Sequence, residues 1–267
     1  MANTASTRID NLKPGDGYVQ SFARGLQVIR SFSASAPRQT LTEVAERSGL
    51  SRAGARRILL TLQSLGYLHS DGKLFSLSPR ILDLGFAYLS SMPIWNVAEP
   101  VMQALVAEVK ESCSAAVLDG TEIVYVMRVP THKIMSISIG VGSRLPAHCT
   151  SLGRVLMAAL PEDERMTILE RSDLSARTRF AVTGIKDIAS RIAQVQKQGW
   201  ALINQELEEG LVSLAAPIKN QTGQTVAAIN ISGQANRTSA KVMQDSMLPQ
   251  LLTAAQGISR LLATQRA

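Results

Sequence analysis

Three arginines in the first third of the chain have the chemistry to bind nucleic acid. Arg52, Arg56 and Arg57 follow Ser51 in a segment with no acidic residue before Leu65. Guanidinium groups bind phosphate oxygens and read guanine edges in the major groove of DNA. Helical spacing places Ser51, Arg52 and Arg56 on one face near the start of the segment, where we expect base contacts. Arg57 is rotated by ~100° from Arg56, so we expect it to meet a phosphate or a local acid.

A second candidate site lies where Thr150 and Ser151 open an apolar helical segment that continues through Leu152. The free amides and the positive dipole end of a helix attract an anion without any charged side chain. Arg144 and His148, just upstream, could supply a cationic partner. A plain helix cap, and a surface arginine paired with a glutamate, are the alternatives. The residues are compatible with a carboxylate site and leave these alternatives open.

Catalytic and metal chemistry find little support in the sequence. His148 and Cys149 are adjacent, but neighbours in a strand point to opposite faces, and a thiolate and its base must lie within hydrogen-bond reach. The acidic cluster of Glu206, Glu208 and Glu209 lacks the histidine or carboxylate spacing of a metal site. We expect these carboxylates to cap or pair locally in a turn. The sequence therefore predicts no catalytic residue, no metal and no cofactor.

The arginine segment lies on the second of two short amphipathic helices within residues 41–65. Gly49 falls between them, where a tight turn needs a residue that tolerates positive φ. Thr40 and Glu43 have the spacing of a capping box for the first helix, and Ser51 can cap the second. This arrangement predicts a helix-turn-helix.

A β-hairpin is predicted directly after the second helix. Residues 66–77 alternate between apolar and polar, with Asp71 and Gly72 between two strand-like runs, which is a strong hairpin signal. A hairpin at this place is the wing of a winged helix. Lys73 lies at its tip, where it could reach a phosphate or the minor groove; a solvated turn lysine is the alternative. The predicted DNA-contacting residues are Thr40, Ser51, Arg52, Arg56, Arg57 and Lys73.

The composition agrees with a two-domain protein that binds a polyanion. The 267 residues carry a net charge of +7, with 45% hydrophobic and 18% charged residues, which is ordinary for a globular chain with room for two domains. Residues 1–90 contain 11 Lys/Arg and 6 Asp/Glu. The excess positive charge is therefore concentrated around the arginine helix, as phosphate binding requires.

The cysteines and the N-terminus indicate a cytoplasmic protein. Cys113 and Cys149 have no Cys-x-x-Cys spacing, and we expect both to be reduced thiols. No apolar run approaches the ~20 residues that span a bilayer. The polar N-terminus lacks the hydrophobic stretch of a signal peptide. We expect residues 1–17 to form a flexible arm and the protein to have no membrane partner.

The remaining pattern predicts an α+β chain with a linker helix. Residues 79–91 begin with Pro79, a favoured first helical residue, and are apolar on more than one face, so the helix should pack against another element or another subunit. This suggests a dimer. The predicted domains are an arm at 1–17, a winged helix-turn-helix domain at 18–78, a linker helix at 79–91 and a second domain at 92–267.

The second domain is expected to be an antiparallel sheet with helices packed against it, because helical and alternating patterns mix along it. The expected helices, with the one that opens the first domain, are 18–32, 94–111, 151–160, 161–171, 185–198 and 239–263. The expected strands are 114–119, 122–129, 134–139, 200–205, 211–219 and 225–232.

With these elements in place, residues 18–262 resemble the IclR family of bacterial transcriptional regulators. The resemblance is carried by SFARGL at 21–26, the run 52–68, SPRILDLG at 78–85 and ELEEGL at 206–211. These segments look especially like the branch that controls aromatic-acid catabolism through the β-ketoadipate pathway, the protocatechuate and 4-hydroxybenzoate regulators. The resemblance implies a winged-helix domain, a dimerising linker helix and a GAF-like effector-binding domain, assembled as a homodimer or a dimer of dimers.

The resemblance also implies a small carboxylate effector and the place where it binds. In such proteins the ligand lies on the sheet, against the start of a helix and a glycine-containing strand segment. Ile203 occupies a position where some relatives carry an acidic residue, which suggests a less polar ligand than glyoxylate or pyruvate and would suit an aromatic ring. The other matching positions are Ser151, Leu152, Leu211, Ser213 and Asn230.

The leading hypothesis is a DNA-binding regulator whose grip on DNA is tuned by a small acid. A dimer would place two recognition helices ~34 Å apart, so the operator should be an inverted repeat in double-stranded DNA. Whether it represses, or activates with RNA polymerase as a further partner, is open. The alternatives are a regulator of a glyoxylate-like or pyruvate-like pathway, an enzyme with a basic N-terminal module, and an architectural DNA binder without an effector.

Overall fold

The computed structural model describes residues 17–92, 94–131 and 139–264. The chain divides into two compact units, residues 1–90 and 91–267. Of the expected arm at 1–17, residues 1–16 lie outside the described residues. In the parts of the chain that the structure describes, no helix is both long and apolar enough to cross a membrane.

The first unit is a three-helix core with a small sheet. Its core contains Val28, Val44, Ala55, Leu59 and Leu68, each at most 4% exposed. The sheet has the order β1-β3-β2 and is antiparallel, which confirms the predicted hairpin and adds a short first strand that the sequence did not predict. The elements are α1 (Gln20–Ser31), β1 (Gln39–Thr40), α2 (Leu41–Ser48), α3 (Arg52–Ser64), β2 (Leu68–Ser70) and β3 (Leu74–Leu77).

Local chemistry explains the helix-turn-helix geometry. Thr40 and Glu43 form the predicted capping box at the start of α2, and Gly49 ends that helix in the left-handed conformation with φ of 66°. A side chain at this φ would be strained. Ser51 then caps α3 by accepting a hydrogen bond from the amide of Gly54 at 3.2 Å. Both predicted caps are therefore confirmed.

The linker after the wing starts with a tighter helix than expected. It consists of a 3₁₀ turn, η1 (Pro79–Ile81), followed by α4 (Leu82–Ser90). Four large apolar side chains of α4 are between 47% and 68% exposed within the described chain: Leu82, Leu84, Phe86 and Tyr88. The described chain therefore leaves these apolar side chains of α4 uncovered.

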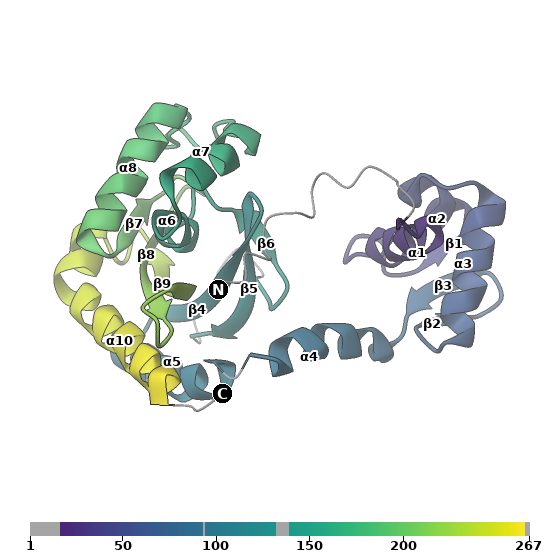
Figure 1. Ribbon diagram of the computed structural model, residues 1–267, viewed down its shortest axis with the longest axis horizontal. Helices are drawn as coiled ribbons and strands as arrows, with labels where there is room; N and C mark the ends of the chain where they lie inside the picture. The colour runs from purple at the N-terminus through teal and green to yellow at the C-terminus, as the bar shows by residue number, and fades with distance from the viewer. Residues whose placement is uncertain (1–16, 93, 132–138, 265–267) are drawn as a thin grey trace. The chain divides into compact units, whose positions relative to one another are not determined.

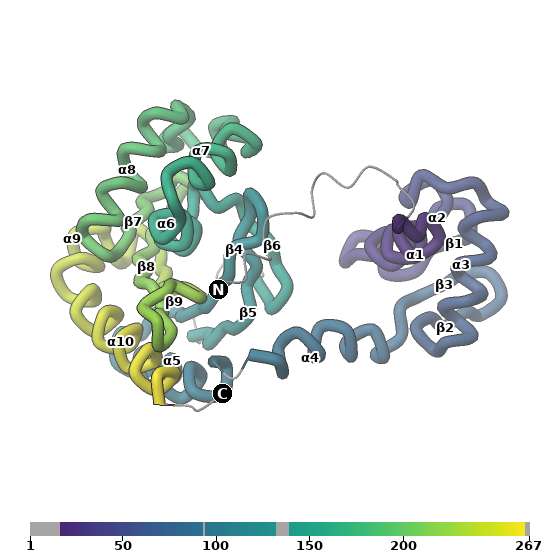
Figure 2. Tube along the Cα trace, in the orientation of Figure 1, coloured from purple at the N-terminus to yellow at the C-terminus, as the bar shows by residue number. Residues whose placement is uncertain are grey.

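The second unit is a six-stranded antiparallel sheet with the order β6-β5-β4-β9-β8-β7. Helices α6, α7 and α8 cover one face, and α5 and α10 cover the other (Figure 1). The tube in Figure 2 shows α5 and α10, the first and last long helices of the unit, side by side. The strands are β4 (Ser112–Asp119), β5 (Glu122–Val129), β6 (Arg144–Pro146), β7 (Ala201–Asn204), β8 (Leu211–Lys219) and β9 (Thr225–Gln234). The helices are α5 (Ile94–Val109), α6 (Ser151–Ala158), α7 (Glu162–Arg171), α8 (Ile185–Gln198), α9 (Ala240–Val242), η2 (Met243–Met247) and α10 (Leu248–Thr264).

Two predictions for this unit need correction or lie outside the described residues, and one strand was not predicted. Residues 134–138 of the expected strand 134–139 lie outside the described residues, and residue 139 is not in a strand. The edge strand β6, which pairs antiparallel with β5, was not among the expected strands. The single helix expected at 239–263 is interrupted by a π-helical turn at Met243–Met247.

Candidate functional site

Helix α3 separates an apolar face from a cationic one. Ala55, Leu59 and Leu62 are buried against the unit's core. Arg52, Arg56 and Arg57 are exposed, as is Ser51. The burial pattern follows from helical spacing, because the positions facing the core recur every three or four residues. The exposed side therefore presents guanidinium groups at the start of a helix, as major-groove reading requires.

The wing holds Lys73 at an exposed tip. The carboxylate of Asp71 accepts hydrogen bonds from the amides of Lys73 (3.0 Å) and Leu74 (2.8 Å), and it pairs with Arg38 at 2.5 Å. These amides hold the pKa of Asp71 below its usual range. The tip is therefore shaped by Asp71 and tied to the segment before β1, which leaves the Lys73 side chain on the surface. The Thr40 hydroxyl donates to Glu43 at 2.8 Å within the capping box.

The linker is attached to the end of α3. The Arg80 guanidinium donates to the carbonyl of Leu65 at 3.0 Å and lies 5.7 Å from the centre of the Tyr67 ring. The Ser78 hydroxyl donates to the carbonyl of Gly66 at 2.5 Å. Leu65 is the C-cap residue of α3 and Gly66 follows it, while carbonyls of the last turn accept from backbone amides. Ser78 and Arg80 therefore bind the carbonyls that directly follow the helix. The orientation of the linker's first turn is thereby fixed to α3.

A cavity lies on the sheet of the second unit beside the N-terminus of α6. The empty space between its lining residues, open solvent at its mouth included, is about 470 Å³. It is lined by Ser114, Tyr125, Arg128, Ile139, Cys149, Thr150, Ser151, Leu152, Ile203, Leu207, Leu211, Ser213, Asn230 and Ser232. The six positions taken over from the family resemblance, Ser151, Leu152, Ile203, Leu211, Ser213 and Asn230, are all among them.

Hydrogen bonds fix the polar groups of this cavity. The hydroxyls of Ser151 and Ser213 lie 2.9 Å apart and join α6 to β8. The side-chain oxygen of Asn230 accepts from the amide of Ser114 at 3.2 Å. Thr150 caps α6 by accepting from the amide of Gly153. Helix geometry leaves the neighbouring amides of the first turn without an intrahelical acceptor, so the helix start can accept an anion.

Close packing holds α6 over the sheet at this point. A Cβ at Gly153 would come within 2.1 Å of the Ala147 carbonyl oxygen. Only glycine permits this approach, because real Cβ contacts are never so short. The glycine therefore sets how near the start of α6 lies to the loop that precedes it.

Arg144 and His148 do not line the cavity, so the sequence was wrong to place them there. The Arg144 guanidinium pairs with Asp119 (2.6 Å) and Glu122 (2.7 Å) on the neighbouring hairpin, which was the simpler alternative. His148 is 2% exposed, and its ring nitrogen Nδ1 has no hydrogen-bond partner within the described chain. Burial, with Arg154 and Arg177, lowers the pKa of His148. Among the described lining residues the cation is Arg128, on β5, which the sequence did not single out.

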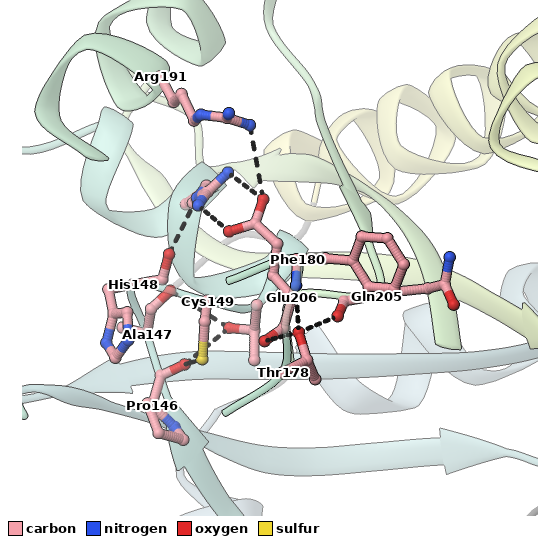
Figure 3. Close-up of polar contacts among 11 residues, drawn as sticks. Pro146, Ala147, His148, Cys149, Thr178, Phe180, Arg191, Gln205 and Glu206 are labelled. Atoms are coloured by element: carbon pink, nitrogen blue, oxygen red, sulfur yellow. Dashed lines mark hydrogen bonds and ion pairs between the residues drawn. The ribbon is translucent and has the colours of Figure 1, made fainter. Parts of the chain in front are cut away.

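Arg154 and Glu206 form a buried ion pair. Figure 3 labels Glu206 and draws its polar contacts. The guanidinium donates to both carboxylate oxygens, at 3.1 and 2.6 Å, and to the carbonyl of His148 at 2.9 Å. The two side chains are 3% and 5% exposed. Arg191 lies 3.7 Å from the same carboxylate. The prediction that this acidic cluster pairs only locally is therefore wrong for Glu206, whose partner is 52 residues away.

The remaining acidic and thiol groups do not form a reactive site. Glu209 lies 3.7 Å from Arg179 on the surface. Burial raises the pKa of Cys149 to about 11, so its thiol stays protonated, and a protonated thiol is a poor nucleophile. Among the described residues, no group of three or more His, Cys, Asp or Glu side chains is placed to hold a metal ion.

Each of the two units matches a known family of protein domains. The IclR helix-turn-helix domain matches residues 21–72. The C-terminal domain of the bacterial transcriptional regulator IclR matches residues 86–260. The two matches together take in the arginine helix, the first strand of the wing and the cavity.

Characterised relatives are transcriptional regulators and not enzymes. The Pca regulon regulatory protein of Pseudomonas putida is 38% identical over 252 residues, which cover 94% of this chain and 87% of the relative. The p-hydroxybenzoate hydroxylase transcriptional activator of Acinetobacter baylyi is 34% identical over 251 residues, covering 92% and 93% of the two chains.

Solved structures show the same fold. A transcriptional regulator from Rhodococcus sp. RHA1 superposes with a TM-score of 0.83 at 46% identity, covering 92% of this chain and 99% of the other. An IclR homologue from Microbacterium hydrocarbonoxydans, solved in complex with 4-hydroxybenzoate, gives a TM-score of 0.80 at 23% identity, covering 91% and 98%. The family matches, the sequence identities and the fold lead to one conclusion: this chain belongs to the IclR family of bacterial transcriptional regulators.

Proposed function

We propose that this regulator controls genes for the catabolism of aromatic compounds and that a small organic acid in the cavity beside α6 modulates its binding to DNA. The observation that carries the proposal is the cavity itself, where the start of α6, Ser151 and Ser213 meet on the sheet. The relatives named for the Pca regulon and for p-hydroxybenzoate hydroxylase support the aromatic pathway. As a DNA-binding protein it would work in the cytoplasm.

The cavity has the composition expected for an aromatic acid. Ile203, Leu207 and Leu211 supply apolar walls, while hydroxyl groups and the open end of α6 supply donors. A carboxylate at the helix start needs no charged partner. A regulator of a glyoxylate-like or pyruvate-like pathway is the second candidate; Ile203, 3% exposed at the wall, argues against it because it places apolar surface where a very polar ligand would need a partner.

For the DNA side, we propose that α3 enters the major groove and the wing lies on the backbone. Ser51, Arg52 and Arg56 would meet base edges. Arg57 and Lys73 would meet phosphates, with Thr40 adding a contact at the start of α2. The exposed apolar side chains of α4 would pair with a second copy, so that a dimer, alone or within a dimer of dimers, reads an inverted repeat. RNA polymerase would be a further partner at promoters that the protein activates.

Two experiments test the proposal. A thermal-shift screen of the full chain against 4-hydroxybenzoate, protocatechuate, terephthalate, β-ketoadipate and cis,cis-muconate should show stabilisation by at least one acid, because a ligand at 100 times its Kd adds about 2.7 kcal/mol. Ser151→Ala should reduce that shift, and Ser190→Ala, an exposed serine on α8, should not. No shift with any acid would contradict the ligand class.

The DNA contacts are tested by selecting duplexes from a random library and measuring sequence preference. Arg52→Ala should lose about 1–3 kcal/mol of discrimination at one base pair. Arg260→Ala, an exposed arginine of α10, is the control for the loss of one positive charge. If Arg52→Ala selects the same sequences as the unaltered protein with the same preference, α3 is not the reading helix.

A further inference from the structure

Two polar side chains of β5 face the cavity although their spacing predicts opposite faces. Tyr125 and Arg128 are three residues apart, and in a regular strand such residues point away from each other. The pairing of β4 with β5 shifts at this point, from Ala115 opposite Met127 to Ala116 opposite Tyr125. The extra residue, Val126, forms a β-bulge that turns both polar side chains to the same side. Bulges next to binding sites often re-aim a side chain in this way.

The rest of the β5 geometry agrees. Arg128 lies opposite Ser114 in the register, and Tyr125 opposite Ala116, so both share the face covered by α6. Tyr125 is 4% exposed. Burial raises its pKa to about 12, so its hydroxyl remains a hydrogen-bond donor at neutral pH. The bulge thus places a phenol and a guanidinium together at the β5 side of the cavity.

This polar pair is far from the helix start. Ser151, at the first turn of α6, bonds to Ser213 on β8. From β8 to β5 the sheet passes through β9 and β4, which at ~4.8 Å per strand separates the two backbones by about 14 Å. The intervening strands contribute Ser114, Asn230 and Ser232 to the lining, and Leu152 and Leu211 lie near the helix start. Ser151 and Ser213 thus lie at the β8 side of the cavity, and Tyr125 and Arg128 lie at its β5 side.

We infer that Tyr125 and Arg128 form a second polar subsite, which selects acids that carry another anionic or hydroxyl group at the end opposite the carboxylate held by α6. This deepens the proposed function and rests on it. A guanidinium has five N–H donors, so Arg128 can bind a ligand carboxylate beside a protein partner. A hydrogen bond to a charged group is also stronger than a neutral one, so a second carboxylate should bind best here. A para-disubstituted ring such as terephthalate has the required shape.

The test is isothermal titration of the full chain with three ligands that share one ring. Benzoate lacks the second group, monomethyl terephthalate keeps its shape without the charge, and terephthalate has both. We expect terephthalate to bind about tenfold or more tightly than the other two, because a hydrogen bond to a charged group contributes at least that factor. Arg128→Met should abolish this preference for terephthalate.

Control variants distinguish the loss of the subsite from a general loss of folding or ligand binding. Arg144→Met removes an arginine from β6, outside the cavity, and should keep the terephthalate preference. Tyr125→Phe should weaken 4-hydroxybenzoate more than benzoate. Equal affinities for benzoate and terephthalate in the unaltered protein would overturn the subsite while leaving the proposed function intact, and this comparison needs no variant to fold. Binding of none of these acids, or of the wider panel above, would instead overturn the proposed function and the subsite with it.

Discussion

Arg154 and Glu206 join two walls of the cavity through a buried, bidentate ion pair. Arg154 lies one turn after Ser151 on α6, and Glu206 directly precedes Leu207 in the loop between β7 and β8. Burial lowers the pKa of Arg154, against the opposing effect of Glu206. The pair is enclosed by further contacts: Thr178 donates to the carbonyl of Gln205 at 2.6 Å. The loop that carries the apolar wall is thereby fixed to the helix that receives the anion.

Breaking this pair should be costly. Arg154→Met alone leaves the carboxylate of Glu206 buried and poorly paired, which costs about 3–5 kcal/mol of unfolding free energy. Combining it with Glu206→Leu should recover much of that loss, because no buried charge then remains. Urea denaturation of both single variants and the double variant measures the coupling. The surface pair Arg179 and Glu209 is the control, where removal should cost ~0–1 kcal/mol; equal costs at the two pairs would refute the account.

His148 should make stability depend on pH. Burial and the nearby Arg154 and Arg177 lower its pKa in the folded protein below 6.5, with Asp173 opposing. The unfolded chain therefore takes up a proton at higher pH than the folded chain, and stability is lost as the pH falls below about 6.5 and through the lower folded pKa. His148→Gln should therefore reduce the fall of the urea midpoint between about pH 7 and pH 5. The control is His69→Gln, at an exposed site. If the urea midpoint changes with pH by the same amount in both variants and in the unaltered protein, His148 has no such role.

Gly153 should tolerate no side chain. Gly153→Ala would force the start of α6 away from Ala147, whose carbonyl oxygen lies 2.1 Å from the new Cβ position, and we expect a loss of about 1–3 kcal/mol, as for other overpacked sites. Ligand binding should weaken as well. Gly257→Ala on α10, where a Cβ meets nothing within 4 Å, should instead stabilise the protein by about 0.4–1 kcal/mol. Thermal unfolding compares the two, and a neutral Gly153→Ala would contradict the close approach.

Ser78 and Arg80 should affect DNA binding from outside the reading surface. Ser78→Ala removes, without changing charge, the hydroxyl that holds the Gly66 carbonyl just after α3, so we expect faster amide exchange in the last turn of α3 and weaker binding to selected duplexes. The salt dependence of binding should not change, because no phosphate contact is lost. Arg80→Ala should increase the exchange at the same turn. Ser76→Ala on the wing is the control, and unchanged exchange in both the Ser78 and the Arg80 variant would mean that the linker does not brace α3.

The sequence predicted those elements whose ends are marked by capping residues or by a helix-ending glycine. The capping box of Thr40 and Glu43 marks the start of α2, and the glycine at 199 marks the end of α8, whose predicted bounds are those observed. The hydrophobic spacing of α3 was sufficient to place its arginines on the exposed side. In each case the signal lies within a few residues of the feature.

The parts that the sequence missed depend on contacts between distant residues or on register. Glu206 looked like a turn carboxylate because its partner, Arg154, is 52 residues away. Arg128 was not predicted to line the cavity, because regular strand alternation places it on the face opposite to Tyr125. The bulge at Val126 brings both side chains to the same face. Arg144 was assigned to the cavity because it precedes α6 in the sequence, whereas β6 carries it to the edge of the sheet.

The central claim is that one protein binds an acid and an operator and that the two events are coupled. Coupling is reciprocal. Saturating the protein with operator must therefore change the Kd for the acid by the same factor by which saturating acid changes the Kd for the operator. The direct measurement is titration of the full chain with the tightest-binding acid, alone and with a saturating selected duplex. We expect the two Kd values to differ by about 5-fold to 150-fold. Equal Kd values with and without the duplex would contradict the account.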